Sequence, residues 1–196
     1  SAFIITSGME KSGFAKRMAL FIVSRFGTTA KKALISLGVV NLLLAFVVPS
    51  TTARAAMLLP ICLMVLNVYQ AVPGKSNFGK QLMIQEIHFN NISTSGILTA
   101  TAPQILAVGY ILSMANVNVT WGEWFIASMP IAILTLIASI IIGNILFKSE
   151  VKAPPSGAGD SGAQSLKDQL KEMGPISRNE IKALCIFALT VFLWAT

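Results

Sequence analysis

Residues 125–147 form an apolar run without a single charged residue, and the run is long enough for a helix to cross a membrane. A spanning helix needs about 20 such residues. The composition agrees, because 54% of the residues are hydrophobic and 12% are charged, whereas a soluble domain carries about 25% charged residues. The chain is therefore predicted to be an all-α polytopic membrane protein.

Basic residues are concentrated in three polar segments, 10–32, 70–82 and 148–180, while segment 114–124 has none. Short loops rich in Lys and Arg stay on the cytoplasmic side of a membrane. The first three segments are therefore predicted to lie inside and the fourth outside. This distribution accounts for the net charge of +7 without a nucleic-acid partner, and no nucleic-acid-binding motif is present.

A polar stretch separates two apolar arms, residues 33–49 and 53–69. Each arm is slightly short for a spanning helix. The outer ends of both arms lie on the predicted cytoplasmic side, so the arms either cross twice or enter the membrane and turn back. The arm lengths and the Pro-Ser-Thr-Thr sequence between them favour a re-entrant hairpin over 33–69, with its tip at 49–54.

The tip of such a hairpin would place the N-terminus of its second arm inside the membrane. The unpaired N–H groups and the dipole of that helix end suit an anion. The hydroxyls of Ser50, Thr51 and Thr52 can cap the helix or bond to a ligand oxygen. Arg54 is a functional candidate because a charge at membrane depth is costly, and it suits the carbonyls that end the first arm. Alternatively, the hydroxyls only cap the arm and Arg54 extends to the membrane interface.

A second polar interruption lies in the middle of residues 83–113, which are otherwise long enough to span. A helix can be broken in the membrane only where protein or a water-filled cavity satisfies its backbone groups. Two interrupted segments in succession indicate two loops that meet at one site. Thr94, Thr99 and Thr101 are then expected to face the hairpin tip. Gly96 would permit close backbone approach.

Two ionisable residues, Glu86 and His88, precede this second interruption. Both follow the loop at 70–82 closely, which predicts a position near the cytoplasmic face. For His88 two roles stay open, namely a hydrogen-bonded histidine at the interface and a proton-coupling residue.

Other classes of membrane protein fit the sequence less well. A membrane-embedded enzyme needs a nucleophile with a base, or a pair of acids. The apolar segments offer hydroxyls, and neither Gly-x-Ser-x-Gly nor His-Glu-x-x-His occurs, so the chain is predicted not to be an enzyme. A purely structural membrane subunit would leave both polar interruptions unexplained. These two classes remain as alternatives.

Four motifs, in this order and spacing, resemble the divalent-anion:sodium symporter (DASS) family of di- and tricarboxylate carriers. They are SGMEKSGFAKRMALFIVSRFG (7–27), PSTTARAAMLLPI (49–61), GILTATAPQIL (96–106) and LKEMGPISRNEIKAL (170–184). The Pro-Ser-Thr-Thr-Ala-Arg form most resembles the branch of 2-oxoglutarate/malate, citrate/succinate and tartrate/succinate exchangers.

The resemblance implies an elevator-type secondary transporter made of two inverted repeats, each with a re-entrant hairpin and a broken helix. The chain would contain the first repeat and the start of the second. The expected segments are the end of a membrane helix with a cytoplasmic-face amphipathic helix (1–32), the re-entrant hairpin (33–69), a cytoplasmic loop with the discontinuous helix (70–113), a short outer loop with a spanning helix (114–147), a cytoplasmic linker (148–180) and the truncated start of the second repeat (181–196).

The resemblance also implies which residues bind substrate. The hairpin motif would contact a substrate carboxylate, and the loop of the broken helix would lie opposite. The residues concerned are Ser50, Thr51, Thr52, Arg54, Thr99, Thr101 and Pro103, with Gly96 as a position of close backbone approach or a cation contact.

Two departures from the family pattern concern sodium. The hairpin motif of the symporters contains an Asn among its sodium ligands where this sequence has Thr51, and Gln104 replaces the Asn that follows the loop proline. Arg54 adds a fixed positive charge nearby. We therefore expect exchange of one dicarboxylate for another without sodium, with a sodium-coupled dicarboxylate symporter as the alternative. No cofactor and no metal site are predicted.

The expected partners are a substrate of the malate, succinate, 2-oxoglutarate, citrate or tartrate class, the lipid bilayer and a second copy of the protein. The expected location is a bacterial inner membrane, and the alternative is the inner envelope of a plastid.

Overall fold

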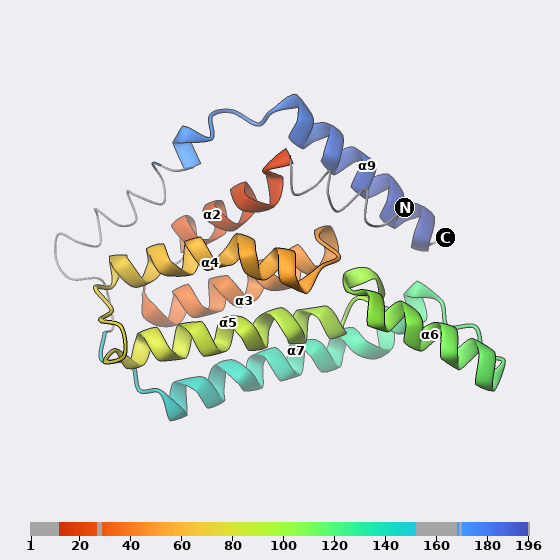
Figure 1. The fold of residues 1–196 in the computed structure, drawn as a ribbon, viewed down its shortest axis with the longest axis horizontal. Coiled ribbons are helices and arrows are strands. Elements are labelled where there is room, and N and C mark those ends of the chain that lie inside the picture. Colours follow the sequence, from red (N-terminus) through yellow and green to blue (C-terminus); the bar gives the residue numbers. More distant parts are fainter. Residues whose placement is uncertain (1–11, 27–28, 152–167, 169, 196) are drawn as a thin grey trace.

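The computed structural model describes residues 12–26, 29–151, 168 and 170–195, and these ranges contain helices and no β-strand (Figure 1). The predicted all-α class is confirmed. The expected membrane helix end before residue 12 and most of the expected linker at 148–180 lie outside the described residues. The elements are α2 (Phe14–Phe26), α3 (Ala30–Val47), α4 (Thr51–Val68), α5 (Asn77–Ser95), the 3-10 turn η1 (Leu98–Ala100), α6 (Ala102–Ala115), α7 (Trp121–Leu146) and α9 (Arg178–Ala195).

Three of the described helices are long and apolar enough to cross a membrane, namely α3, α4 and α7. Helix α7 has 26 residues and is largely exposed in this chain, as expected for a helix that faces lipid or further protein. Helix α6 is apolar but has only 14 residues. The chain is thus a polytopic membrane protein with several apolar helices.

Helix α5 is the centre of the packing, because it contacts α3, α4 and α7 (Figure 1). Its buried face combines aromatic and aliphatic side chains with amides. Gln81 Nε2 donates to Asn144 Oδ1 of α7 at 3.2 Å, and Gln85 Nε2 donates to the carbonyl of Ser139 at 2.9 Å. Polar side chains at membrane depth are stabilised by such bonds between helices, so these amides help to hold α5 against α7.

The start of α5 is held by two side chains. Ser76 caps the helix, with its Oγ accepting from the N–H of Gly79 at 3.1 Å. The carboxylate of Glu150 accepts from the N–H groups of Asn77 and Phe78 at 3.0 and 3.2 Å and from the Ser76 hydroxyl. Burial alone would raise the pKa of Glu150, but these hydrogen bonds hold it below its usual value. The end of α7 is thereby tied to the first turn of α5.

The end of α5 lies beside the middle of α7. A Cβ on Gly96, the residue after α5, would lie 3.1 Å from the Cβ of Ala132, and Ala132 is near the midpoint of α7. Larger side chains at position 96 would therefore collide with α7. If α7 crosses the bilayer, α5 ends close to the membrane's midplane.

Helix α9 is joined to α2 by one arginine. Arg17 Nε donates to Glu180 Oε1 at 2.8 Å, and its Nη atoms donate to the carbonyls of Gly174 and Met173 at 2.7 and 3.0 Å. A guanidinium presents several N–H donors in one plane, so Arg17 can bond to these acceptors at the same time. The segment before α9 is thereby fixed on the amphipathic helix α2.

Candidate functional site

The hairpin turns at residues 48–50, between α3 and α4. Helix α3 ends at Val47, and α4 begins at Thr51 and runs back alongside it (Figure 1). Ser50 caps α4, because its Oγ accepts from the N–H of Ala53 at 3.3 Å. The positive end of the α4 dipole therefore points out of the turn. The turn overlaps the tip expected at 49–54 only at residues 49 and 50, because residues 51–54 already belong to α4. Whether the hairpin re-enters the membrane or spans it twice stays a prediction.

Arg54 lies just behind this turn and is fully buried. Its Nη1 donates to the carbonyl of Val48 at 3.0 Å, directly after the end of α3. Its Nε donates to Asn90 Oδ1 at 3.0 Å, and its Nη2 donates to Thr94 Oγ1 and to the carbonyl of Asn90. All these acceptors are oxygens, which is the environment that a small cation also requires. The guanidinium thus joins the hairpin turn to α5.

Asn90 completes the connection from the side of α5. Its Nδ2 donates to the carbonyl of Thr51 at 2.9 Å, while its Oδ1 accepts from Arg54. One amide therefore holds both the guanidinium and the first residue of α4. Sequence analysis did not single out Asn90. The available signal was the spacing of Glu86, Asn90 and Thr94. Residues four positions apart lie on the same face of a helix, so these three polar side chains share one face of α5.

Glu86 lies one helical turn before Asn90 and is also buried. Asn41 Nδ2 of α3 donates to both of its carboxylate oxygens at 3.0 Å. The carboxylate also interacts electrostatically with Arg54. His88 is exposed and points away from this cluster, into a hollow between α5 and α7 that is also lined by Gln85 and Ser139. The two residues therefore occupy different environments, and the role of each stays open.

The break after α5 is held by α6 and α7. Gln104 Nε2 reaches back across the break to the carbonyl of Thr94 at 2.7 Å. Trp124 Nε1 of α7 donates to the carbonyl of Ser95 at 3.2 Å, and Trp121 Nε1 donates to Thr99 Oγ1 at 3.4 Å. The first two bonds satisfy backbone carbonyls at the end of α5, and the third joins η1 to α7 through side chains. Within a membrane, backbone groups freed by an interruption need such partners.

The structure brings some of the predicted site residues together. Ser50 and Thr51 are partly exposed at the turn and Thr52 is exposed, so hydroxyls are accessible beside the α4 N-terminus. Thr94 meets Arg54 of the tip. The hydroxyl of Thr99 bonds instead to a tryptophan of α7.

The remaining predicted residues lie where α6 begins. Thr101 occupies the N-cap position without a capping side-chain bond, which leaves its hydroxyl available, and Pro103 lies in the first turn of the helix. Proline is favoured there because the N–H it lacks would have no helical partner. Gly96 has an ordinary backbone conformation, so its role is the close approach to α7 described above. Contact of these residues with a ligand stays a prediction.

A metal site of the usual protein type has no support in the described ranges, where no group of three or more His, Cys, Asp or Glu side chains could hold an ion. Sodium would use neutral oxygens instead. At this tip the carbonyl of Val48, Asn90 Oδ1 and Thr94 Oγ1 already accept from Arg54. Arg54 therefore already engages oxygens that could otherwise coordinate a small cation, and sodium independence stays a prediction.

The described helices define an all-α polytopic membrane protein in which a helical hairpin, α3 and α4, packs against an interrupted helix. The chain belongs to the family described as the sodium:sulfate symporter transmembrane region, whose model matches residues 1–196. The divalent-anion:sodium symporter family predicted from the four motifs is thereby confirmed.

Curated relatives cover the whole chain. A "membrane protein" of Cupriavidus necator is 31% identical over 100% of this chain and 37% of its own length. The L-tartrate/succinate antiporter of Escherichia coli strain UTI89 is 29% identical over 99% of the chain and 40% of its own length. The citrate/succinate antiporter of Escherichia coli strain K12 is 27% identical over 98% of the chain and 39% of its own length. The chain thus spans about two fifths of the length of the relatives it matches.

The connection between Arg54 and Asn90 predicts strong coupling between the two residues. Either single variant, Arg54→Met or Asn90→Leu, leaves buried polar groups unpaired and should destabilise the protein by about 2–4 kcal/mol. The double variant removes both partners and should lose clearly less than the sum of the singles. Thermal unfolding of the full-length protein in detergent measures these losses.

A matched control for Asn90→Leu is Asn91→Leu, because Asn91 is exposed and its amide bonds only to the carbonyl of Ile87 in its own helix. Asn91→Leu should change the unfolding temperature little. Two results would contradict a connection between Arg54 and Asn90. One is additive losses of stability in the Arg54 and Asn90 variants, and the other is equal losses of stability in Asn90→Leu and Asn91→Leu.

Proposed function

We propose that the full-length protein is a secondary transporter that exchanges one dicarboxylate for another without sodium, and that this chain supplies the first half of its substrate site. The observation that carries the proposal is the buried guanidinium of Arg54, which fixes accessible hydroxyls of the hairpin turn beside the break in α5. The names of the two antiporter relatives support the substrate class.

The position of the tip supports a substrate site that is accessible in turn from each side of the membrane. Thr94 contacts Arg54 and lies two residues before Gly96, which packs beside the middle of α7. The tip is therefore level with the middle of a 26-residue helix, about 20 Å from either end. Secondary transporters bind substrate near the midplane, where broken helices offer their ends. This position also favours the re-entrant hairpin.

The charges at the tip suit a carboxylate. The N-terminus of α4 carries the positive end of a dipole, and Arg54 adds a full positive charge behind it. Arg54 is buried, and its hydrogen bonds to the described residues all go to protein oxygens. Its proposed role is to hold the turn and attract the anion, while the hydroxyls of Ser50, Thr51 and Thr52 contact the carboxylate.

The arginine also supports the proposal of sodium independence. In a sodium-coupled carrier the ion would neutralise substrate charge and hold the hairpin to its neighbour. Here the guanidinium fills both roles permanently, because its charge cannot be lost at any physiological pH. A carrier with a fixed cation must return with an anion bound or move an uncompensated charge, which favours exchange over net uptake. The alternative, a sodium-coupled symporter, would use a bound sodium ion in these two roles and could therefore carry out net uptake.

Proteoliposomes test the exchange. The full-length protein, reconstituted into vesicles loaded with succinate, should take up labelled tartrate or malate. Empty vesicles should take up little, because the carrier would have no anion for its return. Replacing external sodium by potassium should leave the exchange rate within about twofold. Uptake into empty vesicles that is driven by a sodium gradient would contradict exchange and establish the symporter instead.

Thr52→Val tests the hydroxyls of the tip, because it removes a hydrogen-bonding group and keeps the shape of an exposed side chain. A hydrogen bond to a charged group is worth about 1.5–3 kcal/mol, so the substrate concentration at half-maximal exchange should rise at least about tenfold. Concentration dependence of exchange in proteoliposomes measures the shift.

Thr135→Val is the matched control, because Thr135 is exposed on α7 and its hydroxyl bonds to the carbonyl of Ile131 in its own helix. It should leave half-maximal exchange unchanged. The same concentration dependence in both variants would place the substrate elsewhere.

A further inference from the structure

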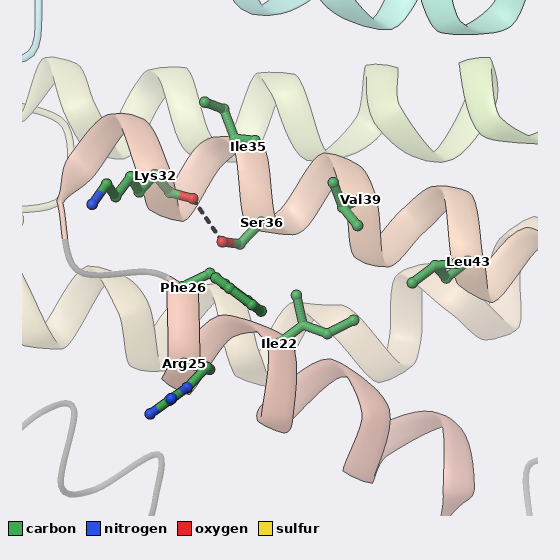
Figure 2. Close-up of a pocket in the computed structure, with 8 residues that line it drawn as sticks. All are labelled: Ile22, Arg25, Phe26, Lys32, Ile35, Ser36, Val39 and Leu43. Atoms are coloured by element: carbon green, nitrogen blue, oxygen red, sulfur yellow. Dashed lines mark hydrogen bonds between the residues drawn. The ribbon is translucent and has the colours of Figure 1, made fainter.

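A groove runs between the end of α2 and the first four turns of α3 (Figure 2). Its volume is about 620 Å³, and it lies on the opposite side of α3 from the buried cluster of the tip, among exposed side chains. The residues that line it are Ile22, Arg25, Phe26, Lys32, Ile35, Ser36, Val39 and Leu43.

The groove is basic at one end and apolar along the rest of its length. Figure 2 shows Arg25 on α2 and Lys32 on α3 toward the same end of the groove, with Phe26 between them. Ile35, Val39 and Leu43 follow along α3 away from Lys32. These three apolar side chains are 47%, 42% and 39% exposed. The groove is thus an open apolar channel with two cations at its mouth.

The polar groups around the mouth leave the two cations available. Among the described residues no acidic side chain lines the groove, and neither Arg25 nor Lys32 forms an ion pair with any of them. The hydroxyl of Ser36 donates to the carbonyl of Lys32 at 2.7 Å, so its proton is already in use. An anion at the mouth would therefore meet two positive charges without a competing carboxylate.

The length of the groove matches one leaflet of a bilayer. Lys32 and Leu43 are separated by about 16 Å along a helix axis, and half of the hydrocarbon core is about 15 Å. Helix α2 is amphipathic, with Ala15, Ala19 and Leu20 buried against the protein and Phe26 exposed. Such a helix lies at the level of the lipid headgroups. The basic residues around α2 predict that it lies on the cytoplasmic side.

We propose that this groove binds an anionic phospholipid. The phosphate lies between Arg25 and Lys32, and one acyl chain lies along Ile35, Val39 and Leu43. Basic residues at the cytoplasmic surface attract anionic headgroups, and pockets between helices bind them specifically. The proposal does not depend on what the protein transports.

Native mass spectrometry tests the site. The full-length protein is released from nanodiscs that contain equal amounts of phosphatidylglycerol and phosphatidylcholine, and retained lipid is counted per protomer. The double variant R25Q/K32Q should bind phosphatidylglycerol roughly 30-fold more weakly than the unmodified protein, with phosphatidylcholine unaffected. The control K75Q/K80Q removes two exposed lysines, Lys75 in the loop before α5 and Lys80 in the first turn of α5, which are predicted to lie on the same side of the membrane. It should match the unmodified protein.

Photocrosslinking identifies the occupant directly. A benzoylphenylalanine at position 39 of the full-length protein should form adducts with phosphatidylglycerol, and these should be lost when R25Q/K32Q is added. Adducts with another part of the same chain or with a second copy would overturn the proposal. Equal phosphatidylglycerol retention by R25Q/K32Q and K75Q/K80Q would overturn it as well.

Discussion

The arrangement of the whole site depends on the burial of one guanidinium. Removing a charged group from water costs several kcal/mol even in real proteins, and that cost is offset only if its donors are satisfied. Arg54 bonds to Val48, Asn90 and Thr94. The hairpin must therefore turn where the carbonyl of Val48 can reach Arg54, and α5 must present its polar face to that turn.

The same interaction determines what the site can do chemically. A charge fixed by three elements of structure cannot leave to accommodate a ligand, so its field acts constantly on the turn. Ser50, Thr51 and Thr52 lie in that field with exposed or partly exposed side chains. The break after α5, held open by Gln104 and two tryptophans, provides a second polar surface nearby. Both surfaces belong to one rigid support, because α5 contacts α3, α4 and α7.

Local chemistry predicts much of this structure. Apolar runs indicated the long helices, and the Pro-Ser-Thr-Thr stretch indicated the turn that the structure places at 48–50. Gly96 and Pro103 marked the break between α5 and α6. Each of these features depends on residues close together in the chain, so the sequence carries its signal.

The partners inside the site could not be predicted in the same way. Arg54 and Asn90 are 36 positions apart, and Asn41 and Glu86 are 45 positions apart. Only the packing of α5 against α3 and α4 determines which polar side chains meet. The predicted position of Glu86 near the cytoplasmic face stays a prediction, while its burial beside Asn41 was not predicted. A polar side chain that recurs every four residues on a buried helix face is the signal that would have indicated both Glu86 and Asn90.

We propose that the guanidinium of Arg54 occupies the place of a cation behind a carboxylate site. A cryo-electron-microscopy structure of the full-length protein with succinate in sodium-free buffer tests this role. We expect succinate bound at the hairpin tip, a carboxylate within hydrogen-bond distance of the hydroxyls at positions 50–52, and Arg54 still joined to Val48 and Asn90. Succinate bound elsewhere, or bound at the tip only when sodium is added and coordinated there, would contradict it.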